Sequence, residues 1–230
     1  MIRKIITTGD GSKTIQIQDW NEQYHSIHGA VNEAYHVFID KGFTYLTNEA
    51  ISILEIGFGT GLYALITLIE AEKKNKIVDY TGIEAYPISI EEISQLDYIE
   101  TLKAEAFREA FLKMHRSSWE NKIVLTPNFS FNKQKKDFRE ISDSNLYDLI
   151  YFDAFGARVQ PELWTEIIFE KMYNALKENG VLVTYSAKGS VRRAMQAVGF
   201  IVERLPGPPG KREMLRAIKV SGETNFSNNS

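Results

Sequence analysis

Short apolar runs alternate along most of the chain with stretches in which apolar residues recur at helical spacing. The runs "ISILEIGF", "VDYTGIEAYP", "KIVLTP", "YDLIYFDAF" and "GVLVTYS" predict five strands separated by helices. Two final runs, "FIVERL" and "EMLRAIKV", are joined by the polar loop "PGPPGK". Because strands that alternate with helices along the chain form parallel sheets, we predict an α/β fold with a seven-stranded, mostly parallel sheet and an antiparallel edge strand.

The N-terminus has a different pattern. "IRKIITTGDGSKTIQIQ" places two runs rich in Ile and Thr around a turn, which predicts a β-hairpin. Ile27, Val31, Tyr35 and Phe38 follow at close to helical spacing. We therefore expect residues 1–46 to form a hairpin and a helix packed on a core domain, residues 47–220 to form that domain, and residues 221–230 to be a disordered tail.

Composition narrows the classes of function. The 230 residues carry a net charge of −3, so a nucleic-acid partner requires a local basic patch. The absence of cysteine excludes disulfides, thiolate metal sites and a Cys nucleophile, and four scattered His residues predict no metal site. No signal peptide or membrane-length segment is visible, so we expect a cytoplasmic protein without a membrane partner.

A glycine-rich turn follows the first of the five strands. "LEIGFGTG" has the spacing E-x-G-x-G-x-G, which differs from the dinucleotide fingerprint G-x-G-x-x-G. It resembles motif I of S-adenosylmethionine-dependent methyltransferases. The residues that this motif assigns to the cofactor are Glu55, Gly57, Phe58, Gly59 and Gly61. Glu55 is expected to meet the cationic methionine portion of S-adenosyl-L-methionine, directly or through water.

Glu84 ends the second of these strands, about 25 residues after the turn. A carboxylate there can accept hydrogen bonds from both ribose hydroxyls of a nucleoside. The alternative is that the glycine-rich stretch is only a tight turn and that Glu55 and Glu84 are solvated acids. For the adenine contact, Asn132 and Asp137 are both candidates, in a stretch ("NFSFNKQKKDF") that we expect to be an irregular loop.

Motifs outside the cofactor site carry a more specific resemblance. "YFDAFGARVQPELWTEIIFEKM", "SVRRAMQAVGF", "GKREML" and the early "YHSIHGAVNEAYHVFI" resemble the methyltransferase domain of the MnmC family, over about residues 15–219. The resemblance implies a Rossmann-like class I methyltransferase that converts aminomethyl-uridine to methylaminomethyl-uridine at the wobble position of tRNA. Many members are fused to a flavin-dependent oxidase, for which this chain has no room. It therefore implies the methylation step alone, with a separate oxidase or upstream modification enzyme as a partner.

The same resemblance places Asp153 at the meeting point of methyl donor and amine. The carboxyl end of the fourth strand faces the ligand crevice of such folds, so we expect Asp153 to contact both cofactor and substrate. Its carboxylate can aim the lone pair of the amine and stabilise the developing positive charge, or it can take the proton; we favour aiming. The alternative is that Asp153 caps the following segment.

Substrate contacts are expected on both sides of Asp153. Phe155 either stacks on a flipped-out uracil or packs in the core, and Tyr24 is expected to cover the active site. The local basic patch for tRNA phosphates is assigned to Arg192, Arg193, Lys211 and Arg212, with Lys133, Lys135 and Lys136 as a second candidate. The alternative for each is a solvated face, and Trp164 is expected in the core.

Two other classes of function compete with this hypothesis. A small-molecule amine methyltransferase or a polyamine-synthase-like enzyme shares the fold and the acid on the fourth strand. Polyamine synthases usually carry further acids there, whereas "AFGARVQP" carries Arg158. A non-catalytic RNA-binding subunit is expected to lose Gly59 or the acids, and all of them are present.

Overall fold

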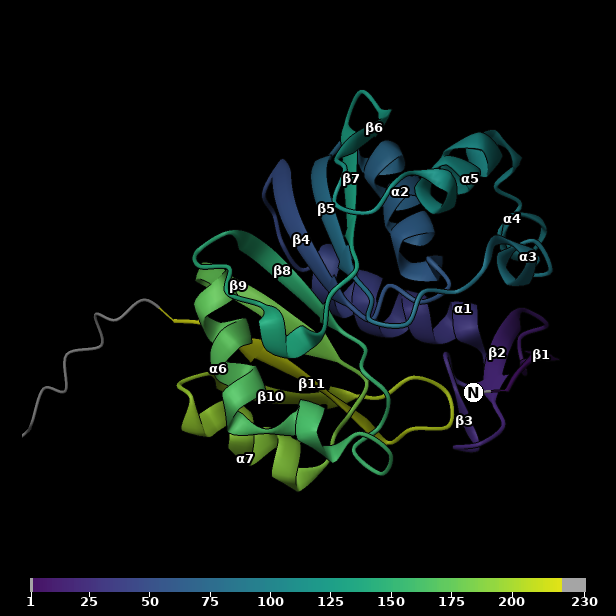
Figure 1. Ribbon diagram of the computed structural model, residues 1–230. Coiled ribbons are helices and arrows are strands. Elements are labelled where there is room, and N and C mark those ends of the chain that lie inside the picture. Colours follow the sequence, from purple (N-terminus) through teal and green to yellow (C-terminus); the bar gives the residue numbers. More distant parts are fainter. Residues whose placement is uncertain (1, 221–230) are drawn as a thin grey trace, which may run out of the picture.

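The computed structural model describes residues 2–220, which form a large β-sheet covered by helices and a small N-terminal sheet (Figure 1). The strands of the large sheet are β4 (Ala50–Ile56), β5 (Ile77–Ile83), β6 (Ile123–Thr126), β7 (Phe129–Gln134), β8 (Tyr147–Phe152), β9 (Leu176–Thr184), β10 (Ile201–Pro206) and β11 (Glu213–Ile218). Their order is β10-β11-β9-β8-β4-β5-β7-β6. The five central strands from β9 to β7 are parallel, which confirms the Rossmann-like α/β fold.

The sheet has eight strands in the described residues rather than the seven predicted. The additional strand is β7, within the stretch that we expected to be an irregular loop. Phe129, Phe131 and Lys133 are buried and alternate with half-buried polar residues, which is the period of a strand. Asn, Lys and Gln are uncommon in strands and hid this alternation. The predicted third parallel strand, β6, is instead the antiparallel edge partner of β7.

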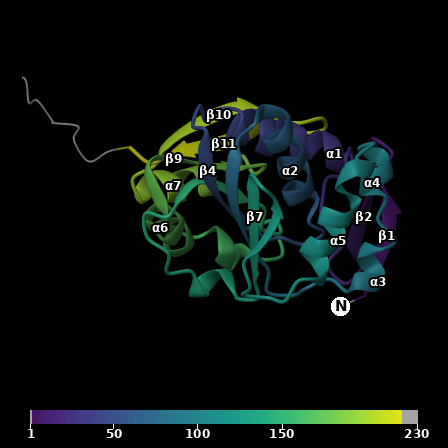
Figure 2. The same cartoon turned by 90° about the horizontal axis from the view of Figure 1, so that it is seen from above.

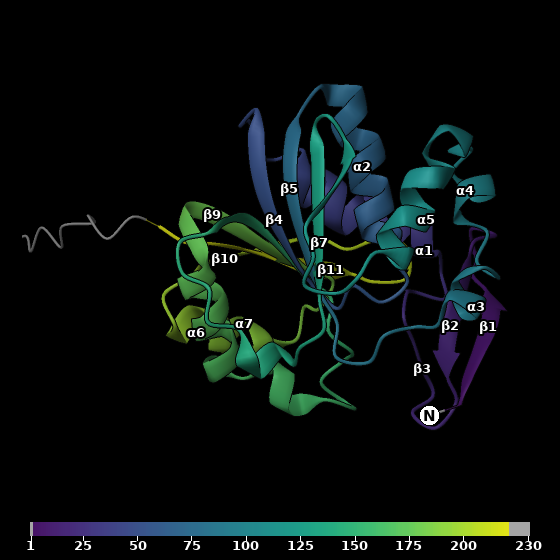
Figure 3. The same ribbon diagram turned by 45° about the horizontal axis from the view of Figure 1, so that its top comes forward.

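Helices cover both faces of the large sheet. The helices after the N-terminal segment are α2 (Leu62–Lys74), α3 (Ile90–Ile93), α4 (Tyr98–Thr101), η2 (Glu105–Phe107), α5 (Arg108–Arg116), η3 (Phe138–Glu140), η4 (Pro161–Trp164), α6 (Glu166–Ala175) and α7 (Gly189–Ala197). The π-helix η1 (Ala34–Phe43) also packs on the sheet, against β8 and β9. Figure 3 shows α6 and α7 on one face and α2 on the other. Along β8, Leu149 and Tyr151 join the core on the α2 side, whereas Ile150 and Phe152 join the core on the α6 side.

The N-terminal hairpin is confirmed as β1 (Arg3–Thr7) and β2 (Lys13–Ile17), extended by the short β3 (Glu22–Gln23). It lies beside α3 and α4, away from α6 and α7 (Figure 2), where Arg3 donates to Glu92 at 3.1 Å. The helix starts later than expected, as α1 (Ala30–Glu33), and continues as the π-helix η1 (Ala34–Phe43). The division at residue 46 stays a prediction, and the predicted tail (221–230) lies outside the described residues.

Phe131 provides a test of how β7 is packed. Its side chain is fully buried, with ring centroids 5.4 Å from Phe58 and 6.1 Å from Tyr80. We expect Phe131→Ala to lower the free energy of unfolding by about 3–5 kcal/mol, as measured by urea denaturation. We expect the milder Phe131→Leu to keep the affinity for S-adenosylmethionine. A large loss of affinity in Phe131→Leu without a loss of stability would show that the ring contacts a ligand rather than the core.

Candidate active site

A cavity of about 510 Å³ lies where the carboxyl ends of three parallel strands meet the N-terminal segment. The lining includes Gly57 and Gly59 after β4, residues 84–86 after β5, residues 153–156 after β8, and residues 22–28. The chain passes from β4 to β5 on one side and reaches β8 on the other, so β4 is the point at which the strand order reverses. Ligands of open α/β sheets bind at such a switch point.

The glycine turn forms the floor of the cavity. Gly57 and Gly59 have φ values of 89° and 48°, in the left-handed region that favours glycine. A Cβ at Gly57 would lie 2.7 Å from the Asp153 carbonyl oxygen, and one at Gly59 would lie 2.9 Å from the Tyr24 ring. Phe58 and Gly61 do not line the cavity. They lie behind it, where Gly61 begins α2 and Phe58 packs on Phe131.

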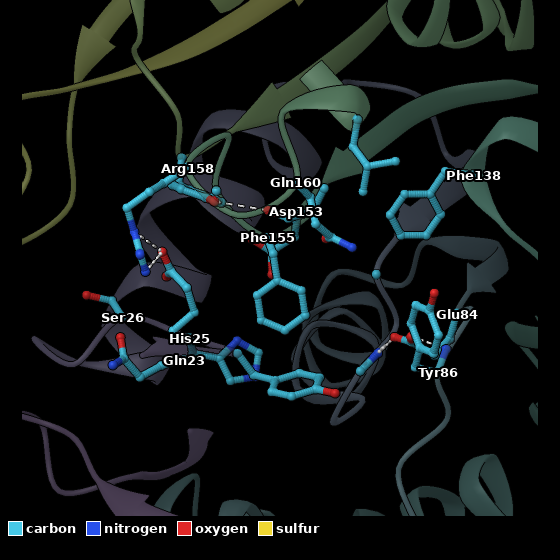
Figure 4. Close-up of a pocket in the computed structure, with 18 of the residues that line it drawn as sticks. Gln23, His25, Ser26, Glu84, Tyr86, Phe138, Asp153, Phe155, Arg158 and Gln160 are labelled. Carbon is cyan, nitrogen blue, oxygen red and sulfur yellow. Dashed lines mark hydrogen bonds and ion pairs between the residues drawn. The ribbon is translucent and has the colours of Figure 1, made fainter. Parts of the chain in front are cut away.

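Glu84 closes the turn from the β5 side. Its carboxylate accepts the Gly59 N–H at 3.0 Å and the Tyr86 N–H at 2.8 Å, and it faces the cavity with only 8% of its surface exposed (Figure 4). Burial raises the pKa of Glu84, and these two backbone donors partly offset the rise. Because an ionised carboxylate can accept about four hydrogen bonds, it retains capacity for ribose hydroxyls. This geometry fits the predicted ribose contact.

The structure places Glu55 behind the glycine turn rather than in the cavity. Its side chain is 1% exposed and accepts a hydrogen bond from the Tyr80 hydroxyl at 2.9 Å. Burial raises the pKa of Glu55 well above its ordinary value, and the charges of Asp153 and Glu84 raise it further. Glu55 therefore does not line the space in which a ligand fits.

Asp153 opens into the cavity from the end of β8. It continues the alternation of Leu149 and Tyr151, and its N–H donates to the Ile56 carbonyl at 3.0 Å, extending the pairing of β8 with β4. Burial raises the pKa of Asp153 well above its ordinary value. The following helix, η4, begins only at Pro161 and has Gln160 as its N-cap. A capping role for Asp153 at that helix therefore does not fit.

An aromatic wall stands beside Asp153. The Phe155 ring makes edge-to-face contacts with Trp20 and Tyr24, at centroid distances of 5.5 and 5.1 Å. Arg158 fixes the N-terminal segment to this wall by donating to Glu22 at 2.9 Å and to the Trp20 carbonyl at 2.7 Å. Tyr24 thus lies over the glycine turn, and Phe155 faces the cavity. The covering role of Tyr24 stays a prediction.

The predicted basic residues differ in their surroundings. Lys211 lines the cavity, where its ammonium pairs with the Glu33 carboxylate and lies 4.0 Å from the centroid of the Tyr185 ring. Arg193 and Arg212 are exposed, and Arg192 is half-buried. In the second candidate patch, Lys133 is 3% exposed and donates to the His115 carbonyl, so Lys133 does not contribute to a surface patch.

The structure separates the two adenine candidates. Asp137 lines the cavity together with Phe138, whereas Asn132 does not. Asp137 also caps η3 and pairs with Arg139 at 2.7 Å. Phe129 lies in the core beside Phe131, and Trp164 is buried as expected.

Sequence reasoning missed several residues that line the cavity. They are Glu33, Tyr86, Phe138 and Tyr185, together with His25 in the N-terminal segment. The position of Tyr86, two residues after Glu84 at a strand end, was a usable signal. No signal in the sequence pointed to Glu33, because an acid within a helical pattern normally faces solvent.

The chemistry of the lining fits S-adenosylmethionine. Glu84, Asp153, Asp137 and Glu33 face the cavity, and Glu55 lies just behind it. Such an acid-rich lining suits a ligand that carries a sulfonium and an ammonium, and it disfavours a pyrophosphate. No group of three His, Cys, Asp or Glu residues within 2–220 is arranged to hold a metal ion, and none of the helices there is long and apolar enough to cross a membrane. The fold and the site together define a class I methyltransferase.

Comparison with known proteins identifies the family. The chain belongs to the S-adenosyl-L-methionine-dependent methyltransferases, whose family model matches residues 96–220. It is 31% identical over 215 residues to the tRNA 5-methylaminomethyl-2-thiouridine biosynthesis bifunctional protein MnmC of Leptospira interrogans, covering 86% of this chain and 32% of that protein. The chain thus spans about a third of the length of the curated relatives that it matches.

Solved structures agree with this family. The crystal structure of MNMC2 from Aquifex aeolicus superimposes with a TM-score of 0.76 at 26% identity, over 96% of this chain and 70% of that one. Spermidine synthase from Thermotoga maritima, at 17% identity and a TM-score of 0.51, covers 94% of this chain and 72% of its own and shares the fold. The predicted cofactor, S-adenosylmethionine, and the predicted methyltransferase class are confirmed.

The buried charge of Glu55 gives a pH-dependent prediction. Its folded pKa is raised above the unfolded value near 4.5, so the unfolded state loses the proton first as the pH rises. Stability is therefore lost above about pH 4.5, until the folded pKa is reached. Near pH 4.5 we expect Glu55→Gln and the wild type to have the same melting temperature. At pH 8 we expect the variant to melt at a higher temperature, by about 2–4 °C for each 1 kcal/mol of stability that the wild type has lost. Exposed Glu170→Gln is the control, and equal melting of Glu55→Gln and wild type at pH 8 would contradict the prediction.

The glycine turn gives a second prediction. Ala at position 59 must adopt a positive φ, which costs about 1–2 kcal/mol, and its Cβ meets the Tyr24 ring. We expect Gly59→Ala to weaken S-adenosylmethionine binding at least about tenfold, measured by isothermal titration calorimetry. Gly189→Ala is the control, because an added Cβ there meets only the flexible end of Arg193. Unchanged affinity in Gly59→Ala would show that the turn does not approach the cofactor.

Proposed function

We propose that this chain is an N-methyltransferase that converts aminomethyl-uridine to methylaminomethyl-uridine at the wobble position of tRNA. The observation that carries the proposal is the Asp153 carboxylate, which opens into the cavity between the glycine turn and the aromatic wall of Phe155. The likeness to MnmC proteins, whose name specifies tRNA 5-methylaminomethyl-2-thiouridine biosynthesis, supports the choice of substrate. Since that substrate is a tRNA, the proposal includes a cytoplasmic location.

Only the methylation step is proposed for this chain. The chain matches about a third of the length of the bifunctional relatives. A separate oxidase or upstream modification enzyme is proposed as the source of the aminomethyl group. We also propose the division at residue 46. In that scheme residues 47–220 hold the cofactor, and residues 1–46 supply Tyr24 and Glu33 to the acceptor side of the cavity.

The cofactor is held by residues at the ends of β4 and β5. Gly57 and Gly59 allow the backbone to approach it, and Glu84 accepts the ribose hydroxyls. Asp137 and Phe138 are proposed to lie at the adenine, because they line the cavity after β7. Bound S-adenosylmethionine supplies an electrophilic methyl group on a sulfonium.

Asp153 acts on the acceptor amine. The amine must be neutral to have a lone pair, and it becomes positively charged as the new bond forms. An ionised Asp153 accepts an N–H hydrogen bond, which aims the lone pair, and its charge stabilises the cation in the transition state. Burial raises the pKa of Asp153, which brings it closer to the role of a base than an ordinary aspartate. We nevertheless propose aiming as its main role.

The target base is proposed to rest against the aromatic wall. Phe155 and Tyr24 present ring surface beside Asp153, and single bases stack on such rings. Around the mouth, Lys188 at the start of α7 and the side chains of Arg192, Arg193 and Arg212 are proposed to meet tRNA phosphates. Lys211 is left out of this surface, because it is paired inside the cavity.

Substitution of Asp153 tests the function and the residue together. We expect Asp153→Asn to slow methyl transfer by about 10²–10⁴-fold, because the amide keeps the shape but loses the charge. S-Adenosylmethionine binding should persist. The assay is transfer of a labelled methyl group to tRNA carrying aminomethyl-uridine, with unmodified transcript as the control substrate and exposed Asp79→Asn as the control variant.

Two outcomes would contradict the proposal in different ways. Full activity of Asp153→Asn would make Asp153 structural. Transfer by the wild-type protein to a small amine such as a polyamine, with none to the tRNA, would replace the proposed substrate with the small-molecule alternative. Binding of tRNA without transfer to any amine would instead support a non-catalytic RNA-binding subunit.

A further inference from the structure

A buried ion pair lies at the acceptor end of the cavity. Glu33 comes from α1 and Lys211 from the connection between β10 and β11, and both line the cavity with Asp153. The Glu33 side chain is 4% exposed and the Lys211 side chain 30%. Two carboxylates and one ammonium therefore share one end of a small cavity.

Contacts on several sides fix this pair. One Glu33 oxygen accepts from Lys211 and the other accepts the Ser26 N–H at 3.2 Å. The Lys211 ammonium lies 4.0 Å from the centroid of the Tyr185 ring, and the Tyr185 hydroxyl donates to the Ala154 carbonyl at 3.0 Å. A lysine held in this way faces the reacting groups rather than a phosphate outside.

The pair acts on Asp153 in opposite directions. The charge of Glu33 raises the pKa of Asp153 and the charge of Lys211 lowers it. The other titratable groups that interact with Asp153 are Tyr63 from α2, Glu55 from β4 and Tyr185 after β9. Among these partners in the described chain, Lys211 is the cation whose charge lowers the pKa of Asp153; Arg158 and Lys188 also line the cavity.

The proposed reaction makes this charge consequential. An alkyl amine has a pKa near that of lysine, about 10.4, and is mostly an unreactive ammonium at neutral pH. Asp153 and Glu33 together would hold the ammonium firmly, because nearby opposite charges favour the charged form. A cation in the same place disfavours the ammonium and leaves Asp153 to bind the neutral amine.

We infer that the Glu33–Lys211 ion pair is a positioning and specificity element that balances the charge around Asp153, so that the acceptor amine is bound in its neutral, nucleophilic form. This inference rests on the proposed amine methyltransferase function. The positive charge of Lys211 disfavours a second ammonium beside Asp153. Glu33 holds Lys211 in place. The cavity thereby accepts an uncharged primary amine and discriminates against a protonated one.

The test uses substitutions at the two partners with opposite predicted effects. Single-turnover methyl transfer to tRNA carrying aminomethyl-uridine is measured from pH 6 to pH 10 at saturating S-adenosylmethionine. We expect Lys211→Met to move the acid limb of the rate profile to higher pH by about one unit or more, and Glu33→Gln to move it to lower pH. Lys211→Arg, which keeps the charge, should restore the wild-type midpoint. Lys122→Met, in an exposed ion pair with Asp79, is the matched control.

A second measurement is independent of activity. In cofactor-free protein with ¹³C-labelled aspartate, the Asp153 carboxyl resonance is titrated. Lys211→Met should raise its midpoint and Glu33→Gln should lower it, in variants whose thermal melting confirms a folded protein. If Lys211→Met does not fold, Lys211→Gln and Glu33→Gln carry the comparison.

Opposite shifts in the two variants support the inference. Shifts in the same direction, or a loss of rate with unchanged midpoints, overturn it, because a purely structural pair would act in that way. A wild-type protein that methylates no aminomethyl-uridine overturns the proposed function instead. In that case the carboxyl titration still decides whether the ion pair balances the charge around Asp153.

Discussion

Carboxylates gathered at one edge of a parallel sheet determine which charges this cavity favours. Glu55, Glu84 and Asp153 end three neighbouring strands, and burial raises the pKa of each. Charges that are buried with few partners are costly, and a positively charged ligand offsets that cost. The preference for a sulfonium cofactor follows from this constraint, and so does the proposed reaction, which creates a cation on nitrogen.

Neutral hydrogen-bond donors contact the carboxylates of Glu84 and Glu55 directly. The Gly59 and Tyr86 N–H groups donate to Glu84, and the Tyr80 hydroxyl donates to Glu55. The positive φ values of Gly57 and Gly59 bring the turn close enough for the Glu84 contact. Fixed dipoles of this kind stabilise charge without neutralising it, so Glu84 stays available to a ligand.

The sequence was sufficient for the parts of the site that local pattern determines. The glycine turn, Glu84 and Asp153 each follow an apolar strand, and strand ends of a parallel sheet meet at one edge. The eighth strand was missed because polar residues occupy one face of β7, and Lys211 was misread because its partner, Glu33, lies 178 residues away. Periodicity along the chain contains no information about such a pair.

The two halves of the cavity therefore differ in how they are encoded. The cofactor half is local, since Gly59 and Glu84 are 25 residues apart and joined by one crossover. The acceptor half is assembled by contacts between distant segments: Arg158 with Glu22 across 136 residues, and Lys211 with Glu33. A substitution in the acceptor half can change which acceptor is bound and leave the turn that holds the cofactor intact. Members of one fold can thus keep a common methyl donor while their acceptors diverge, because the wall around Asp153 is built from segments that the cofactor site does not need.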